Sequence, residues 1–162
     1  MRREKKGCII NITSVSGRIA TSPLGAYAAS KFALEAISEA LAMEVKPFNI
    51  RVAMVEPGII NTDMAKNISH GGNAIYPHVN RFGGLFVASL KTPTPATLVA
   101  DKILEIAERE TWILRHPVGP DAKPFLDWRA AMTDEEWIER AAVADEEWYV
   151  ATERDFGLDA RK

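Results

Sequence analysis

Residues 8–17 read CIINITSVSG, a mostly apolar run that gives way to hydroxyl side chains and a glycine. A short apolar run bounded by polar residues predicts a strand buried on both faces of a sheet. From Ala26 the pattern changes, because apolar residues then recur three and four apart, at Leu34, Ile37, Leu41 and Val45. That spacing predicts a helix with one apolar face.

A second strand is predicted just after this helix. Pro47 ends the helix, and residues 49–58, NIRVAMVEPG, form another apolar run closed by Pro57 and Gly58. A strand, a helix and a strand joined by short links make a βαβ unit, whose strands are parallel and whose crossover is right-handed. The predicted fold class is therefore α/β, with a parallel sheet.

The segment after this unit carries weaker signals. Residues 59–90 are looser and contain the glycine pairs Gly71–Gly72 and Gly83–Gly84. The dipeptide Thr94–Pro95 predicts the cap and the first position of another helix. Residues 111–119, TWILRHPVG, predict a third strand, so we expect a sheet of about three strands within residues 1–119.

Residues 120–162 are predicted to form a helical C-terminal extension. Thr133 and Glu136 have the spacing of a capping box. Acidic residues then alternate with aromatic ones, among them Trp137, Trp148 and Tyr149. We expect a pair of helices that lays its aromatic side chains on the domain and its acidic ones in water. The alternative is a lid or a partner surface.

The overall composition argues against several classes of function. The 162 residues carry a formal net charge of -2, which favours neither nucleic acid nor an anionic membrane as a partner. No apolar run approaches the length of a membrane span. The single cysteine, Cys8, cannot form an internal disulfide, which favours a reducing, cytoplasmic compartment. His70, His78 and His116 lack the spacing of a metal site, so no metal is expected.

Three segments are expected to converge at one edge of the sheet. Tyr27 and Lys31 lie four residues apart on the predicted helix and so share a face. An ammonium beside a phenol stabilises the phenolate, and such a phenol can act as a general acid or base. Ser14 follows the first strand, residues 57–62 follow the second, and ligands bind at the carboxyl ends of strands in such sheets. Taken singly, the pair could arise by chance, and Ser14 could be a turn or cap residue.

The order and spacing of these residues resemble the second half of a short-chain dehydrogenase/reductase. That family has a serine thirteen residues before the tyrosine of a Tyr-x-x-x-Lys motif, as Ser14, Tyr27 and Lys31 have here. Pro57, Gly58 and Thr62 similarly match its Pro-Gly-x-x-x-Thr segment. The resemblance covers roughly residues 7–119. It implies a partial Rossmann-like, doubly wound parallel sheet and an NAD(P)-dependent oxidoreductase acting on a carbonyl or a secondary alcohol.

The resemblance also implies a role for each matching residue. Tyr27 would exchange a proton with the substrate oxygen, and Ser14 would hydrogen-bond that oxygen. Lys31 would favour the ionised phenol and bind the nicotinamide ribose. The remaining cofactor-binding positions are those of the turn after the second strand, where the nicotinamide carboxamide is held: Pro57, Gly58, Ile60 and Thr62.

The resemblance also shows what this sequence does not contain. The family's first strand, glycine-rich turn and helix hold the cofactor's pyrophosphate and adenine, and no Gly-x-x-x-Gly-x-Gly occurs here. The choice between NAD and NADP therefore stays open. We expect a truncated product whose first strand has a bare edge, poorly stable unless it assembles. The rival hypothesis is a non-catalytic remnant or subunit that functions by assembly with other chains.

Two further expectations concern partners. The helix Tyr27–Val45 is rich in alanine, and in the resembling family this helix often forms a dimer interface, so we expect a homo-oligomer. Close packing of these small residues against the sheet is the alternative. The substrate is expected to lie between residues 61 and 90, against an apolar pocket that includes Ile75, Tyr76, Phe82, Leu85 and Phe86.

Overall fold

A computed structural model of the chain describes residues 1–68 and 75–161. Its centre is a parallel sheet in the order β1 (Gly7–Ile12), β2 (Ile50–Pro57) and β3 (Arg115–Val118). Gly7 pairs with Ile50 at one end of the β1–β2 ladder, and Pro57 pairs with Val118 at the far end of the β2–β3 ladder. The predicted βαβ unit and the parallel α/β sheet are confirmed.

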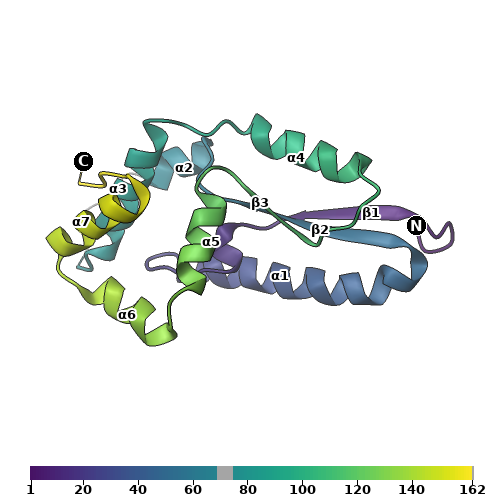
Figure 1. Ribbon diagram of the computed structural model, residues 1–162, viewed down its shortest axis with the longest axis horizontal. Coiled ribbons are helices and arrows are strands. Elements are labelled where there is room, and N and C mark those ends of the chain that lie inside the picture. Colours follow the sequence, from purple (N-terminus) through teal and green to yellow (C-terminus); the bar gives the residue numbers. More distant parts are fainter. Residues whose placement is uncertain (69–74, 162) are drawn as a thin grey trace.

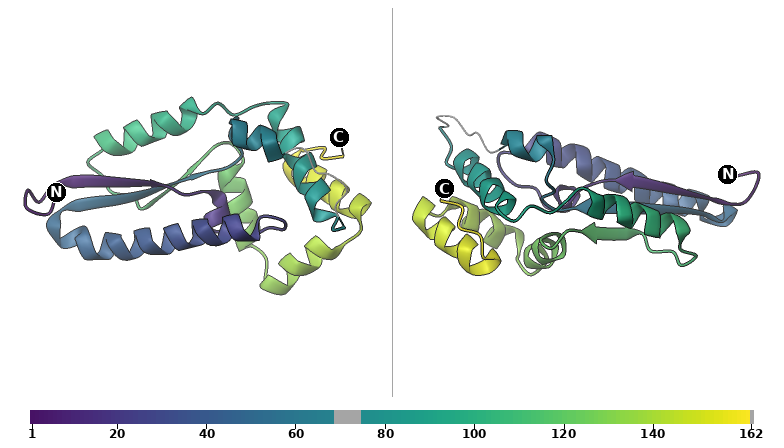
Figure 2. Two further views of the ribbon diagram at one scale, coloured as in Figure 1. Left: turned by 180° about the vertical axis from the view of Figure 1, so that it is seen from behind. Right: turned by 90° about the horizontal axis from the view of Figure 1, so that it is seen from above.

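Helices cover both faces of this sheet and its carboxyl end. Helix α1 (Gly25–Val45) lies on one face and α4 (Thr97–Glu108) on the other (Figure 1). The remaining helices gather where the strands end, away from the N-terminus, as both figures show (Figures 1 and 2). They are α2 (Asp63–Ile68), α3 (His78–Leu90), α5 (Ala122–Ala130), α6 (Asp134–Ala142) and α7 (Asp145–Phe156).

The two faces of β2 differ in chemistry. Because side chains alternate along a strand, Ala53 and Val55 point to one face and Val52, Met54 and Glu56 to the other. The first pair joins a hydrophobic core with Ile106 of α4 and Val118 of β3. The second face carries Glu56, only 1% exposed, whose charged partners are Arg18 and Arg115, so the layer between this face and α1 has to hold charged groups as well as apolar ones.

That requirement corrects the predicted face of α1. The buried residues of this helix are Ala28, Glu35, Ser38 and Ala42. Ile37, which belonged to the predicted apolar face, is 63% exposed. The small residues divide between two faces, since Ala28 and Ala42 are buried whereas Ala29, Ala33, Ala36 and Ala40 are exposed. The periodicity predicted the helix correctly and its buried face only in part.

Residues 59–118 also depart from the sequence-based prediction. The looser segment contains two helices, α2 and α3, and Gly83–Gly84 lies inside α3. Helix α4 begins at Thr97, and its N-cap residue Ala96 has no side-chain cap. The third strand is shorter than expected and starts only at Arg115. The other glycine pair, Gly71–Gly72, lies outside the described residues.

The C-terminal extension folds as three helices rather than two. The capping box of α6 is confirmed, since the Thr133 amide donates to Glu136 Oε2 at 2.8 Å and the Glu136 amide to Thr133 Oγ1 at 3.2 Å. Trp128 on α5 contacts Trp137 on α6 at 5.2 Å and Phe156 on α7 at 4.9 Å between ring centroids. The acidic first turns of α6 and α7 are exposed, as predicted.

Helix α3 joins this extension through one buried arginine. Arg81 Nε donates to Asp145 Oδ1 at 2.7 Å, and its other nitrogens donate to the carbonyls of Ala141 at 3.0 Å and Val143 at 2.6 Å. These bonds satisfy a guanidinium that is only 3% exposed as a residue and hold the α6–α7 junction against α3. Among the residues that the structure describes, no helix combines the length and apolar character needed to cross a membrane.

Candidate functional site

Ser14 lies directly beyond the carboxyl end of β1, as expected. It is 8% exposed and caps the short 3-10 helix η1 (Val15–Gly17), because its Oγ accepts from the Ser16 amide at 3.1 Å. The same hydroxyl lies 3.5 Å from the carbonyl oxygen of Pro57, to which it donates. The structure thus gives Ser14 the capping role considered from the sequence, and also places it beside the end of β2.

Tyr27 and Lys31 stand on consecutive turns at the start of α1. Lys31 Nζ lies 5.7 Å from the centroid of the Tyr27 ring and donates to the carbonyl of Ile12 at 3.1 Å. This bond fixes the ammonium at the carboxyl end of β1. Gly17 permits the close packing of η1 on α1, because a Cβ there would lie 3.2 Å from the Lys31 carbonyl oxygen and 2.9 Å from Glu35 Cγ.

The turn after β2 is held from several sides. The Gly58 amide donates to the Val118 carbonyl at 2.9 Å, and the Asn61 amide to the Thr94 carbonyl at 2.9 Å. Ile60 is buried, and Thr62 Oγ1 accepts from the Ala65 amide at 3.3 Å, at the start of α2. The predicted positions Pro57, Gly58, Ile60 and Thr62 therefore form one fixed segment at the carboxyl edge of the sheet.

The sequence analysis missed an acidic side chain that contacts this turn. Asp121 Oδ2 accepts from the Ile59 amide at 2.7 Å. No helix was predicted directly after Asp121, so no sequence signal indicated this side chain. The side chain makes no cap hydrogen bond to α5 and is turned toward β2 instead.

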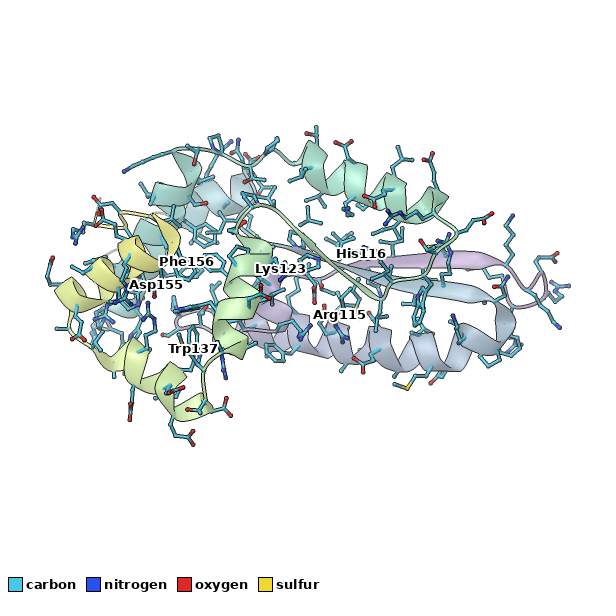
Figure 3. All side chains as sticks on the ribbon, in the orientation of Figure 1. Arg115, His116, Lys123, Trp137, Asp155 and Phe156 are labelled. Atoms are coloured by element: carbon cyan, nitrogen blue, oxygen red, sulfur yellow. The ribbon has the colours of Figure 1, made fainter. Side chains whose placement is uncertain are left out.

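A cluster of charged side chains, also missed, lies beneath the site. Arg115 of β3, labelled in Figure 3, donates from Nε to Glu35 Oε2 at 2.9 Å and from Nη2 to Glu39, both on α1. Its Nε lies 3.8 Å from Glu56 Oε1, and Arg18 Nη1 lies 3.5 Å from the same oxygen. We call these five residues the charge cluster. Its members come from α1, β2, β3 and the end of η1; of these elements, α1 also carries Tyr27 and Lys31, and β2 ends at Pro57.

The charge cluster perturbs its own members in opposite directions. Burial, reinforced by the neighbouring carboxylate of Glu35, raises the pKa of Glu56 above its ordinary value. The hydrogen bond and charge of Arg115 lower the pKa of Glu39, which lies at the solvent side. Three carboxyl groups share two guanidinium groups, so the cluster favours a proton on its most buried member.

The residues at the edge fit the nicotinamide end of a dinucleotide. The turn offers a glycine without a side chain, the backbone groups at Ile60 and Thr62, and the Thr62 hydroxyl, while Lys31 supplies a cation. The amides of Gly58, Ile59 and Asn61 are already bonded within the protein. No group of three or more His, Cys, Asp or Glu side chains among the described residues could hold a metal ion. His78 and His116 each contact a backbone carbonyl oxygen, of Ala141 at 3.1 Å and Ile113 at 3.0 Å, and His70 lies outside the described residues.

The predicted apolar lining is present only in part. Phe82 and Phe86 are half-buried on α3, with ring centroids 4.8 Å apart, and Leu85 between them is half-buried too. Ile75 is 93% exposed and Tyr76 is 69% exposed. These two side chains face solvent at residues 75–77, just before α3, so the structure does not place them in a pocket.

The site therefore combines a buried hydroxyl, a phenol with an adjacent ammonium, and a turn whose backbone is held by internal hydrogen bonds. A phenol and a hydroxyl at one edge can move a proton to or from a substrate oxygen and hydrogen-bond that oxygen. Nothing in this set of side chains is itself a redox group, so oxidation or reduction there would use a bound cofactor.

Comparison with known proteins gives matches of the same kind. The family model described as short chain dehydrogenase matches residues 1–73. An uncharacterised oxidoreductase of Schizosaccharomyces pombe is 31% identical over 142 residues, which cover 85% of this chain and 59% of that protein. The match extends beyond the motif residues into the C-terminal extension.

Solved structures show the same relationship. A short-chain dehydrogenase from Streptomyces avermitilis superimposes with a TM-score of 0.62 and 33% identity over 88% of this chain and 54% of its own. A short-chain dehydrogenase from Burkholderia cenocepacia, solved in complex with NADP, has a TM-score of 0.62 and 22% identity over 88% of this chain and 50% of its own. This chain spans a little over half the length of the first curated relatives it matches.

Proposed function

Because this chain belongs to the short-chain dehydrogenase/reductase family, we propose that it carries the catalytic groups of an oxidoreductase that transfers a hydride between NAD or NADP and a carbonyl or secondary alcohol. The observation that carries the proposal is the position of Lys31 beside Tyr27, at the carboxyl edge where Ser14 and the turn after β2 also lie. The cofactor, when bound, supplies or accepts the hydride.

Each side chain has a separate task in this proposal. In the direction of reduction, the substrate carbonyl carbon gains a hydride while its oxygen gains the proton of the Tyr27 hydroxyl. Ser14 donates a hydrogen bond to that oxygen and stabilises the charge that develops on it. Lys31 stabilises the phenolate that forms when Tyr27 gives up its proton. The reverse sequence oxidises an alcohol, with Tyr27 accepting the proton.

The turn after β2 would orient the nicotinamide end of the cofactor. Backbone groups near Ile60 and the Thr62 hydroxyl would bind the carboxamide, and Lys31 would bind the ribose. The substrate would lie toward α3, whose half-buried Phe82, Leu85 and Phe86 favour an apolar group beside the reacting carbon. The choice between NAD and NADP is left to measurement, since no residue of this chain is assigned to the adenosine end of either dinucleotide.

We also propose that the protein assembles through α1. The face of this helix turned away from the sheet is apolar and exposed, with Phe32 at 42%, Ile37 at 63% and Met43 at 69% exposure. Exposed alanines lie between these large side chains and would permit close approach of a second helix. An apolar stripe of this size on one helix is typical of a surface covered in an assembly.

The direct test is a titration of the purified chain with NADH and NADPH, followed by nicotinamide fluorescence. The proposal predicts saturable binding of at least one dinucleotide. Lys31→Ala should weaken that binding, because the ribose contact is lost. Lys91→Ala is the matched control, since Lys91 is an exposed lysine at the end of α3. Absence of binding by the unchanged chain would contradict the proposal for this chain and favour the rival, non-catalytic role.

A further inference from the structure

Asp121 occupies the space where any side chain at position 58 would lie. A Cβ built on Gly58 would be 2.3 Å from Asp121 Oδ1 and 2.4 Å from Oδ2, well inside contact distance. A Cβ on Gly119, which has φ +109, would be 2.9 Å from the same Oδ1. Two glycines, one at the end of each of two neighbouring strands, thus make room for a single carboxyl group.

This carboxyl group is kept there at a cost. Asp121 Oδ1 is buried and has no hydrogen-bond partner among the described residues, and burial raises the pKa of the Asp121 carboxyl. The residue is also the N-cap of α5, where an aspartate commonly bonds to the first turn of its helix, yet it makes no such bond. The hydrogen bond from the Ile59 amide, at 2.7 Å, is the contact that the arrangement provides across the strand ends.

We propose that Asp121 is a positioning residue: it locks the Gly58–Ile59 backbone, and with it the groups at Ile60 and Thr62 that would bind the nicotinamide carboxamide. The inference rests on the proposed function for its last step. It also explains why position 58 is a glycine, because the absence of a side chain there makes room for Asp121 as well as for a cofactor. Asp121 is also the first link between the turn and the C-terminal extension.

A second contact joins the extension to a loop near the site. Trp137 Nε1 on α6 donates to the Ala20 carbonyl at 3.2 Å, in the loop between η1 and α1. Asp121 and Trp137 therefore tie the two ends of one helical unit, α5 and α6, to the segments that follow Ser14 and Pro57. Through these two contacts the extension holds both segments in place.

Thermal unfolding of four proteins tests the contact itself: the unchanged chain, Gly58→Ala, Asp121→Ala and the double variant. Gly58→Ala should lower the Tm by several degrees, because the new methyl group meets the carboxylate. In the Asp121→Ala background the same change should cost much less, because that carboxylate is gone. Additive Tm losses would overturn the proposal, since neighbours in contact are expected to be non-additive.

Amide hydrogen exchange provides a second readout if Gly58→Ala does not fold. Asp121→Ala should speed exchange of the Ile59 amide at least about tenfold, as expected when a hydrogen bond to a charged group is lost. Asp121→Asn keeps an acceptor oxygen and should leave the rate near that of the unchanged chain. Asp127→Ala, also on α5 and exposed, is the matched control. Unchanged exchange in Asp121→Ala would overturn the proposal.

Dinucleotide binding then separates this inference from the proposed function. Asp121→Ala should weaken NADH or NADPH binding, whereas Asp121→Asn and Asp127→Ala should not. If the unchanged chain binds and Asp121→Ala binds equally well, the positioning role is overturned and the proposed function stands. If the unchanged chain binds neither dinucleotide, the proposed function and the last step of this inference both fail, while unfolding and exchange still decide whether Asp121 holds the turn.

Discussion

The ring and the hydroxyl of Tyr27 can be tested separately. Tyr27→Phe removes the hydroxyl and keeps the ring that lies beside Lys31. We expect this variant to bind dinucleotide as before and to lose turnover by roughly 10²–10⁴-fold, the usual contribution of a general acid or base. The measurement is steady-state oxidation of NADH or NADPH with a panel of apolar ketones and aldehydes.

Tyr149→Phe is the control for this substitution, because Tyr149 is a half-buried tyrosine on α7, in the C-terminal extension. It should leave turnover unchanged. Equal turnover in Tyr27→Phe and the unchanged chain would contradict the role of Tyr27 as proton donor. Loss of dinucleotide binding in Tyr27→Phe would instead point to a structural role for the hydroxyl.

Glu56 predicts a pH dependence of stability. Its pKa is raised above 4.5 by burial and by Glu35, so between 4.5 and the higher folded-state value the folded chain holds more protons than the unfolded chain. Its contribution to stability is therefore complete below about pH 4.5 and is lost as the pH rises through the folded-state pKa. Glu56→Gln removes the ionisation and should flatten this decline.

The measurement is the Tm at a series of pH values from 4 to 8 for the unchanged chain, Glu56→Gln and Glu44→Gln. Glu44 is an exposed carboxyl on α1 and serves as the control for charge alone. We expect the Tm difference between the unchanged chain and Glu56→Gln to change with pH, whereas Glu44→Gln should run parallel to the unchanged chain. A constant difference for Glu56→Gln would contradict the raised pKa.

At the scale of elements, local sequence patterns were sufficient to predict the βαβ unit and the start of α6. Apolar runs and periodicity depend on neighbouring residues, and so does a capping box. The polar face of α1 could not be predicted in this way, because the hydrogen-bond partner of the buried Glu35 carboxylate is Arg115, which lies 80 positions later in the chain. Asp121 was missed for the same reason, since its partner Ile59 lies 62 positions away.

Two threonines with similar sequence signals have different environments, and this difference can be measured. Thr133 forms a reciprocal capping box with Glu136, so Thr133→Ala should cost about 1 kcal/mol of stability. Thr94 was predicted to be a cap, but α4 starts after Ala96, so Thr94→Ala should change stability little. Denaturant titration of both variants checks the contrast. Equal losses would contradict the boundaries of α4.

At the scale of the whole molecule, β1 forms one edge of the described sheet. It pairs with β2 alone in the part of the chain that the structure describes, and its Ile12 is 40% exposed. An unpaired strand edge presents free backbone donors and acceptors to other chains. The apolar face of α1 is another exposed surface, and assembly at either of these surfaces would bury exposed groups.

The exposed face of α1 gives the sharper prediction, because one substitution there can disrupt an interface without changing the strand edge of β1. Ile37 is 63% exposed near its centre, and Ile37→Glu would place a charge in any interface formed there, which desolvation makes costly. We expect the unchanged chain to sediment as a dimer or larger oligomer and Ile37→Glu to sediment as a smaller species.

Ile138→Glu on α6 is the matched control, because Ile138 is 65% exposed. This substitution should leave the assembly intact. A monomeric unchanged chain, or an Ile37→Glu variant that sediments as the unchanged chain does, would contradict assembly through α1 and leave the β1 edge as the surface to test next.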